Sequence, residues 1–396
     1  MAASSFAPSP ELESDLHRLF VRSLGVGIVF SILSCVGGWL YPGDFFRSYL
    51  MGYLFWLGLA LGALGIVMMQ YLTAGAWGVM TRRTLESATR TLPLLALLFV
   101  PIAFGMPHLY DWAHPDLVRK EYTLQHRAAY MNPTMFVLRA VLYFAVWYAF
   151  SYFLNRWSKE QDENGGSERR LAALSAAGLI VYVFTVTFSA VDWAESLETD
   201  WYSTIWGFLF VANQGLSAFA FVIIAMALLS KREPLKSTFK AAHLHDLGKL
   251  LLTFVMLWAY FSFSQLLIVW SGNLTGEIPW YLRRLGTSWG WLGVLLILFQ
   301  FVVPFLLLLS RPVKRNAILL CGVVGIIILM RFVDLMWIVM PSYYEKGFRL
   351  SWLNFSVPLA IGGLWMATFA RQLPTRPLLP IGAPNLERAI EHGEEE

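Results

Sequence analysis

The sequence predicts an all-α, polytopic membrane protein, and three observations support this fold class. Hydrophobic residues make up 57% of the 396 residues and charged residues only 14%, roughly half the charged share of ordinary soluble domains. Ten stretches are long and apolar enough to cross a bilayer as helices. The 17 Trp and 16 Tyr residues are typical of chains with aromatic belts at membrane interfaces.

The ten expected spans follow one another along most of the chain. They cover residues 20–40, 50–72, 92–106, 134–154, 171–191, 202–229, 247–270, 289–310, 317–340 and 352–370. The third is short and contains Pro93 and Pro101, which are unfavourable inside a helix. Spans 2–5 and 6–9 would form two four-helix bundles of parallel orientation, with spans 1 and 10 peripheral. Gly58 and Gly62, four residues apart in span 2, permit a close helix approach.

The basic residues predict the topology. Of the 30 Lys and Arg residues, 20 fall on the side of the two termini and 8 on the opposite side. This bias predicts that both termini are cytoplasmic. It divides the chain into a cytoplasmic N-terminal segment (1–19), a transmembrane domain (20–370) and a cytoplasmic tail (371–396). Glu11, Glu13 and Asp15 precede the first apolar run, which is unlike a signal peptide.

Two polar segments outside the spans have a distinctive composition. Residues 156–170 are rich in charge and glycine and predict a mobile polar linker on the cytoplasmic side. The tail is first broken by prolines and then acidic, so we expect it to be disordered or laid against a partner subunit.

The composition also argues against several classes of cofactor and ligand. Cys35 and Cys321 lie inside apolar runs, which is incompatible with a disulfide framework or a Cys-ligated iron–sulfur cluster. None of the seven histidines falls in the middle of a span, which argues against a haem held by two histidines. The net charge of +4 comes from basic loops and reports topology, not binding to nucleic acid. We therefore expect no metal and no cofactor within this chain.

Charged residues in the outer half of the spans are the first functional candidates. Arg139 lies about two turns inside span 4, and Asp192 closes span 5. Arg331 and Asp334 are three residues apart and share a face of span 9. An isolated charge in the bilayer costs about 2.5–3.5 kcal/mol, so pairing is expected. One interpretation is a structural ion pair of Arg331 with Asp334 or Asp192; the other is a carboxylate that exchanges protons with a quinol or a water chain.

A second candidate lies at the inner edge, where His243, His245, Asp246 and Lys249 precede or begin span 7. Asp246 and Lys249 can pair at i, i+3 in the first turn, with Asp246 favourably placed at the helix N-terminus. Three interpretations stay open: a helix cap with interfacial anchors, a cytoplasmic site of proton uptake, or a metal site. The metal site would need a loop, since His243 and His245 point apart in a helix.

Uncharged polar residues within the spans could connect the two edges. They are Asn213, Gln214, Gln265, Gln300, Tyr260, Thr185 and Ser189. Such groups most often form hydrogen bonds between membrane helices; the alternative is a relay assisted by water. No carboxylate occupies the midplane, so side chains alone would not make a continuous relay. In the outer loop (108–133), His108, Asp111, His114, Asp116 and His126 favour contact with a partner over a metal site.

Three stretches resemble a known family. They are LQHRAAYMNPTMFVLRAVLYFAVW (124–147), DWAESLETDWYSTIWG (192–207) and HDLGKLLLTFVMLWAYFSFSQLLIVWSGNL (245–274). Together they resemble the F subunits of alternative complex III, within the NrfD-like family of polysulfide- and nitrite-reductase membrane subunits. The family has Pro-His after the SLE run, where this chain has Thr199 and Asp200. The difference removes a histidine and adds an outer carboxylate.

The resemblance implies a fold of two four-helix bundles plus two outer helices, and a complex in the bacterial cytoplasmic (inner) membrane. In that complex quinol would be oxidised near the periplasmic side, and electrons would leave through iron–sulfur and multihaem cytochrome c subunits. The quinol site would belong to a sister NrfD-like subunit, while this chain would serve proton conduction. Whether a quinone also binds here stays open.

We therefore expect a cofactor-free membrane subunit of a quinol:acceptor oxidoreductase, without a complete active site of its own. The alternatives are a stand-alone secondary transporter and a purely structural scaffold. The candidates for a proton path are Asp192, Asp334, Arg331, Arg139, Gln214, Gln300, Gln265, His245, Asp246 and Lys249.

Overall fold

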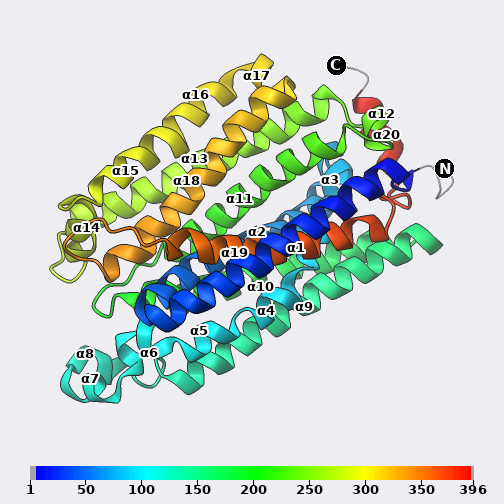
Figure 1. Cartoon of the computed structure of the whole chain (residues 1–396). Coiled ribbons are helices and arrows are strands. Elements are labelled where there is room, and N and C mark those ends of the chain that lie inside the picture. Colours follow the sequence, from blue (N-terminus) through cyan, green and yellow to red (C-terminus); the bar gives the residue numbers. More distant parts are fainter. Residues whose placement is uncertain (1–5, 394–396) are drawn as a thin grey trace.

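The computed structural model describes residues 6–393, which form helices and connecting loops without any strand. The long helices lie side by side, and the first and last described residues lie at the same end of the bundle (Figure 1). Ten helical stretches in this range are long and apolar enough to cross a membrane. The predicted all-α fold with ten spans is confirmed, and the chain is a multi-pass membrane protein. We call the end that carries both termini the terminal end, and the other the opposite end.

The first five crossings come from seven helices. They are α1 (Pro10–Leu40), α2 (Pro42–Thr73), the series α3 (Ala76–Thr89), α4 (Leu92–Leu97) and α5 (Val100–Phe104), then α9 (Pro133–Asn164) and α10 (Glu168–Trp193). Short helices cover the opposite end between and after them: α6 (Met106–Leu109), η2 (Asp111–Ala113), α7 (Pro115–Lys120), α8 (Tyr122–Arg127) and η3 (Glu195–Leu197).

The last five crossings also come from seven helices. They are α11 (Trp206–Leu229), α13 (Ala241–Gly272), the series α15 (Gly290–Leu296), η4 (Ile297–Val302) and α16 (Val303–Leu309), then α18 (Ala317–Val339) and α19 (Leu353–Gln372). The shorter elements are α14 (Ile278–Leu285) and η5 (Met340–Ser342) at the opposite end, and α12 (Leu235–Thr238), α17 (Arg311–Arg315), η6 (Leu373–Thr375) and α20 (Leu386–His392) at the terminal end.

Two four-helix groups meet along α2 and α11. The first group joins α2, the α3–α5 series, α9 and α10, and the second joins α11, α13, the α15–α16 series and α18. The apolar membrane-length stretches of α2 and α11 are 89% and 72% buried, so these helices form the core. A Cβ at Gly62 would lie 2.0 Å from the backbone oxygen of Gln214. Glycine is therefore required where α2 meets α11, which confirms the predicted close approach.

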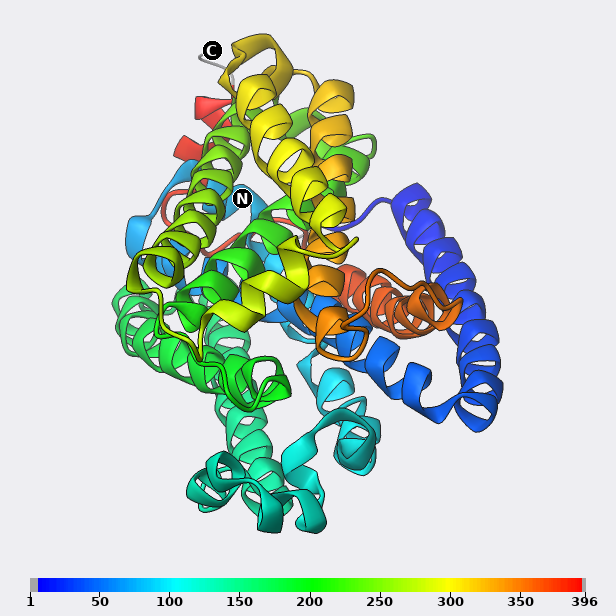
Figure 2. The same cartoon turned by 90° about the vertical axis from the view of Figure 1, so that its left-hand side faces the viewer.

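The two additional helices differ in their exposure. α1 and α19 pack against each other beside α2, as Figure 2 also shows. A Cβ at Gly363 would lie 2.3 Å from the nitrogen of Gly27, so small residues bring the two backbones together. Only 11% of the α1 window is buried, against 72% for α19. α1 is thus peripheral as predicted, whereas α19 is enclosed between α1 and α2.

The third crossing begins earlier than predicted. The stretch from Ala76 to Phe104 forms it, whereas the predicted span began at residue 92. Its first helix, α3, buries Arg82, Arg83 and Glu86. These charged residues lower the apolar signal although the helix is internal. Pro93 and Pro101 lie in the first turns of α4 and α5, where the missing amide proton costs least.

The predicted mobile linker is mostly helical. α9 continues to Asn164 and α10 begins at Glu168, which leaves only residues 165–167 between them. Ion pairs at i, i+4 join Arg156 to Glu160 (3.0 Å) and Lys159 to Glu163 (3.4 Å) and support the exposed helix. Gly165, with φ of +67°, then ends it in the left-handed conformation that favours glycine.

The described part of the tail packs against the chain itself, which corrects the expectation of disorder. The Leu378 nitrogen donates to the Phe6 oxygen (2.9 Å), and the Gly382 nitrogen donates to Asp162 Oδ1 (3.1 Å). Leu379 is fully buried. We call residues 373–392 the terminal strap. At the other terminus α1 already begins at Pro10, capped by the Ser9 hydroxyl, so half of the predicted segment 1–19 is helical.

Candidate functional site

Asp192, near the end of α10, lies at the centre of the first buried polar cluster. Arg139 Nε donates to Asp192 Oδ2 (2.8 Å) and Arg139 Nη2 donates to Oδ1 (2.9 Å). The Tyr143 hydroxyl also donates to Oδ2 (2.8 Å). Such a two-point contact is a strong form of ion pair. The partner of Asp192 is therefore Arg139 of the neighbouring helix α9, and the suggested pairing with Arg331 was wrong.

Asp334, on α18, forms the second cluster, which we call the Asp334 cluster. Its partner is Arg331, one turn earlier, and both residues are about 5% exposed. α11 supplies the polar neighbours: Asn213 Nδ2 donates to Asp334 Oδ2 (3.4 Å), and Arg331 Nε donates to Ser217 Oγ (3.3 Å). The predicted pair of Arg331 with Asp334 is confirmed. The uncharged side chains of Asn213 and Ser217 connect this pair to α11.

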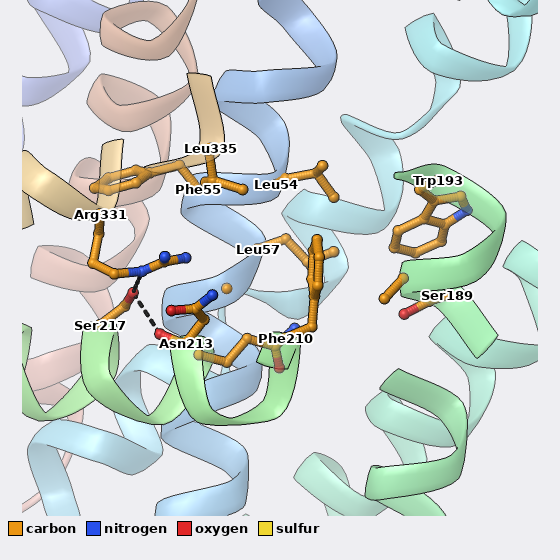
Figure 3. A pocket seen from close by; sticks show the side chains of 13 residues that line it. Leu54, Phe55, Leu57, Ser189, Trp193, Phe210, Asn213, Ser217, Arg331 and Leu335 are labelled. Carbon is orange, nitrogen blue, oxygen red and sulfur yellow. Dashed lines mark hydrogen bonds between the residues drawn. The ribbon is translucent and has the colours of Figure 1, made fainter. Parts of the chain in front are cut away.

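A small cavity lies beside the Asp334 cluster and extends to the end of α10. Figure 3 shows Arg331, Asn213 and Ser217 on one side of it, and Ser189 and Trp193 on the other. The cavity has a volume of about 20 Å³. A water molecule needs about 10–15 Å³ and two or more polar partners. The site therefore has the room and the chemistry to hold a water between α10, α11 and α18.

Gln214 lines the same cavity and extends it toward α10. Its Oε1 accepts a hydrogen bond from the Tyr182 hydroxyl (2.7 Å). The Tyr182 ring lies against α2, because a Cβ at Gly65 would be 3.2 Å from it. Gln214 thus joins α11 to α10 through a hydrogen bond, and its side chain also lines the water-sized cavity.

Gln300 lies on η4, a π-helical turn within the eighth crossing. In the amide orientation that satisfies both groups, it donates to the Met330 oxygen (3.1 Å) and accepts from Trp258 Nε1 (3.0 Å). It therefore joins the eighth crossing to α18 and α13, as the interhelical interpretation predicts. π-helical turns occur frequently at functional sites.

Gln265 is buried on α13, with an exposed fraction of 3%. Its Oε1 accepts from the Ser203 hydroxyl (2.7 Å), whereas its Nε2 has no partner among the described residues.

The other two mid-span candidates, Thr185 and Tyr260, do not join the clusters. Thr185 accepts from Trp147 Nε1 (2.9 Å), and the Tyr260 side chain points out of the bundle, 63% exposed.

The histidine pair and its neighbours lie inside α13, which begins at Ala241, six residues before the predicted span. His243 Nδ1 accepts from the Lys240 nitrogen (3.1 Å), and its Nε2 donates to the Ala389 oxygen (2.7 Å). His245 is buried on another face of the helix. Because both histidines are helical, they point apart. This geometry does not suit a metal site formed by the two.

Asp246 is bound from both sides. Lys249 Nζ donates to its Oδ1 (3.0 Å), as predicted, and His392 Nε2 of the terminal strap bonds to its Oδ2 (2.9 Å). The earlier start of α13 moves Asp246 to the second turn, away from the free amides of the helix N-terminus. The predicted favourable position at the N-terminus was therefore wrong, because the helix extends beyond the apolar residues.

A buried cluster at the terminal end was missed by the sequence analysis. Arg83 Nη1 donates to Glu86 Oε2 (2.5 Å) and to Ser158 Oγ (2.9 Å), and Arg83 also binds Asp162. The Tyr71 hydroxyl donates to Glu86 Oε1 (3.3 Å). The i, i+3 spacing of Arg83 and Glu86 could have predicted this ion pair. In the prediction from sequence, Arg83 contributed only to the assignment of topology.

The other missed cluster surrounds Glu198 at the opposite end. Arg283 and Arg284 of α14 both bind its carboxylate, and the Ser342 hydroxyl donates to it (2.8 Å). Arg284 is fully buried, with its guanidinium 3.7 Å from the centre of the Trp280 ring. Burial lowers the pKa of Arg284 to about 10, so the group is a cation at neutral pH. Glu198 falls in the SLE run that carries the resemblance.

The outer-loop residues suggested as a metal or partner site are dispersed. His108 stacks on Phe46, and His114 Nε2 bonds to the Pro107 oxygen (2.7 Å), while His126 stacks on Tyr122. Within residues 6–393, no group of three or more His, Cys, Asp or Glu side chains is arranged to hold a metal ion.

The sequence was also compared with known proteins. Neither the protein-family models nor the curated proteins include a match to the sequence.

Proposed function

We propose that this chain is an integral membrane subunit of a quinol:acceptor oxidoreductase complex, and that it conducts protons without a redox cofactor of its own. One observation carries the proposal: two stretches that resemble alternative complex III, 192–207 and 245–274, meet at the Ser203–Gln265 hydrogen bond. The first of them supplies three buried carboxylates, Asp192, Glu195 and Glu198. Buried carboxylates at membrane depth are costly and typical of functional sites.

The partners follow from the same resemblance. The chain would pack beside a sister NrfD-like subunit that binds quinol, with iron–sulfur and multihaem cytochrome c subunits completing the complex in a bacterial cytoplasmic membrane. The bias of Lys and Arg supports a cytoplasmic terminal end. All seven histidines lie in loops or near the ends of helices, away from the positions that would ligate a membrane haem. This supports electron transfer outside the chain.

The proposed proton route runs along α2. Its outer part is the pair of clusters around Asp192 and Asp334, together with the cavity that extends from Arg331 to Ser189 and Trp193 of α10. Gln214 and Tyr182 extend the polar groups toward Gly65, and Gln70 and Tyr71 follow about one and a half turns further along α2. Glu86 lies beyond Tyr71. Water would have to bridge the stretch between Tyr182 and Tyr71.

Glu86 and Asp246 are alternative cytoplasmic ends of this route. Glu86 is fully buried and bonded to Tyr71 of α2. Asp246, the candidate from the sequence together with His245 and Lys249, lies on α13 beneath the terminal strap. The position of Glu86 beside α2 favours Glu86.

Purification from native membranes tests the complex. We expect an affinity-tagged chain to retain a sister membrane subunit, a c-type haem spectrum and iron–sulfur signals in electron paramagnetic resonance. A lone chain that moves a solute in proteoliposomes would instead establish the transporter. One observation already opposes it: transporters of this kind break helices at matching positions of each half, whereas α13, the counterpart of the broken third crossing, is continuous from Ala241 to Gly272.

Matched variants of the complex test proton conduction. We expect Asp334→Asn and Asp192→Asn to lower quinol-driven proton translocation in proteoliposomes while the subunits remain assembled. Glu86→Gln should have the same effect and Asp246→Asn little. If these variants weaken only the assembly of the complex, the two clusters have a structural role. If proton translocation is unchanged, the chain is a structural scaffold.

A further inference from the structure

A groove lies at the terminal end of the bundle, between the first turns of α1 and the end of α19. We call it the α1–α19 groove. Its volume is about 410 Å³, within the range of about 300–1,000 Å³ typical of small-molecule sites. Neither the proposed proton route nor the polar clusters described above use this space. It is therefore a separate candidate for binding.

The α1–α19 groove lies at the level where two apolar runs end. The first predicted span begins at residue 20 and the tenth ends at residue 370, and Phe20 and Ala370 both line the groove. The lining residues beyond them, Glu13 of α1 and Arg371 of α19, are charged and exposed. The groove therefore crosses the boundary between the hydrocarbon core of a bilayer and its head-group layer.

Apolar side chains form the part of the groove that is nearer to the bilayer core. Leu16 of α1 and Ala370 of α19 are 5% and 1% exposed. Phe20 is half-buried and lies four residues after Leu16, so the two side chains share one face of α1. This part of the groove suits an acyl chain.

Three ionisable side chains of the groove form no ion pair and no hydrogen bond within residues 6–393. They are Glu13, His17 and Arg371. Asp15, on another face of α1, is by contrast bound by Arg232 (2.9 Å). Glu13 and Arg371 carry opposite charges, yet they do not pair across the groove. An occupant would thus find both an unpaired anion and an unpaired cation.

The order of these charges matches the order of groups in an ethanolamine phospholipid. Arg371 directly follows the end of the tenth apolar run, at the level of a phosphate. Glu13 precedes Phe20 by seven residues, about 10 Å along α1, at the level of the terminal ammonium. His17 lies between them, and an imidazole N–H can donate to a phosphate oxygen.

We propose that the α1–α19 groove binds a phospholipid with a phosphoethanolamine head group. Arg371 and His17 would bind the phosphate, since contacts between a guanidinium and a phosphate are strong hydrogen bonds. Glu13 would accept from the ammonium, and an acyl chain would lie along Leu16 and Phe20. This inference does not depend on the oxidoreductase complex, because every group that it uses belongs to this chain.

Other common head groups fit these charges less well. Phosphatidylglycerol carries no cation, so Glu13 would stay unpaired beside its phosphate. Phosphatidylcholine carries a methylated ammonium, which has no N–H to donate to a carboxylate. Only the ethanolamine head group of these three supplies a phosphate for Arg371 and N–H donors for Glu13.

The test is lipid retention by the full chain, with any subunits that co-purify left in place. The protein is delipidated in detergent and mixed with equal amounts of dioleoyl phosphatidylethanolamine, phosphatidylcholine and phosphatidylglycerol, and native mass spectrometry measures the lipids that stay bound. We expect phosphatidylethanolamine to predominate. Arg371→Gln should lower retention of all three lipids about tenfold, because it removes a charged hydrogen bond to their shared phosphate. Glu13→Gln should bring the ratio of bound phosphatidylethanolamine to phosphatidylcholine close to one.

Glu11→Gln and Arg18→Gln are the matched controls, because both residues are exposed charges of α1 that do not line the groove. Both variants should retain lipids as the unchanged chain does. Equal retention of the three lipids by the unchanged chain would overturn the proposal, and so would a preference for phosphatidylglycerol. Glu11→Gln with the same effect as Glu13→Gln would overturn it as well, since the selectivity would then come from the general charge of α1.

Discussion

Asp334 and Arg331, one turn apart on α18, form an ion pair that separates two spaces of different character. Arg331 lines the water-sized cavity beside Asn213 and Gln214, whereas Asp334 lines a larger, mostly apolar groove between α13, α14, α15 and α18. The pair therefore lies between a small cavity that has several polar side chains on its wall and a larger apolar groove. The contribution of this pair to protein stability and its proposed role in proton translocation can be tested separately. Arg331→Met tests the stability of the protein, and Asp334→Asn tests proton translocation.

Removing only the cation should destabilise the protein. Arg331→Met leaves the Asp334 carboxylate buried without its cation, with uncharged donors such as Asn213 Nδ2 (3.4 Å) in its place, and breaking a buried pair in this way costs about 3–5 kcal/mol. Arg331→Met with Asp334→Leu removes both charges and should recover most of the loss. The measurement is the thermal unfolding midpoint in detergent. A double variant no more stable than Arg331→Met would contradict the pairing.

The contact of α2 with α11 gives a second prediction. Gly62→Ala would put a Cβ 2.0 Å from the Gln214 backbone oxygen, an overlap that the helices can relieve only by moving apart. Overpacking of this kind costs about 1–3 kcal/mol or more. Folded yield and the unfolding midpoint should both fall.

Gly58→Ala, one turn away, is the control, because its Cβ would lie 3.6 Å from Gln214 Cγ in ordinary contact. Its midpoint should match that of the unchanged chain. If Gly62→Ala and Gly58→Ala had equal unfolding midpoints, α2 and α11 would not be in close contact at Gly62.

Features set by local pattern could be predicted from the sequence. The ten spans follow from apolar length, and the pairs Arg331–Asp334 and Asp246–Lys249 follow from i, i+3 spacing within one helix. Gly62 was identified from the spacing of small residues. In each case the prediction depends on residues close together in one helix or on composition alone.

Features set by packing between helices could not be predicted. Which arginine binds Asp192 depends on α9 lying beside α10, and both Arg139 and Arg331 had the right depth. α3 was missed because its buried charges are neutralised by Asp162 of α9 and Arg376 of the strap, contacts that no local window contains. The apolar groove beside Gln265 likewise forms only where residues of α11, α13, α14, α15, η4 and α18 meet.

The terminal strap gives a third prediction. A Cβ at Gly382 would lie 2.0 Å from the Gln161 oxygen, so Gly382→Ala should lift the strap from the end of α9. Trypsin should then cleave faster after Arg388, which lies on α20 within the strap. The exposed substitution Glu387→Ala is the control and should leave the rate unchanged. Equal cleavage rates for both variants would show that the strap is not held at Gly382.

Arg284 gives the last prediction, because it is a fully buried cation with one counter-charge. Its guanidinium donates to Glu198 and to the backbone oxygens of Trp280, Trp337 and Ile338. Glu198→Gln leaves that cation without a carboxylate, and we expect a loss of about 3–5 kcal/mol. Arg284→Lys should also destabilise the protein, since an ammonium cannot reproduce the planar fork of donors.

Arg283→Met provides the comparison, since the side chain of Arg283 binds the same carboxylate but is 34% exposed. Partly exposed pairs contribute about 1 kcal/mol or less, so its unfolding midpoint should fall least of the three. Tryptophan fluorescence should shift in Arg284→Lys, because the guanidinium lies over Trp280. If Arg283→Met were as damaging as Glu198→Gln, the exposed arginine, and not the buried one, would hold α14 in place.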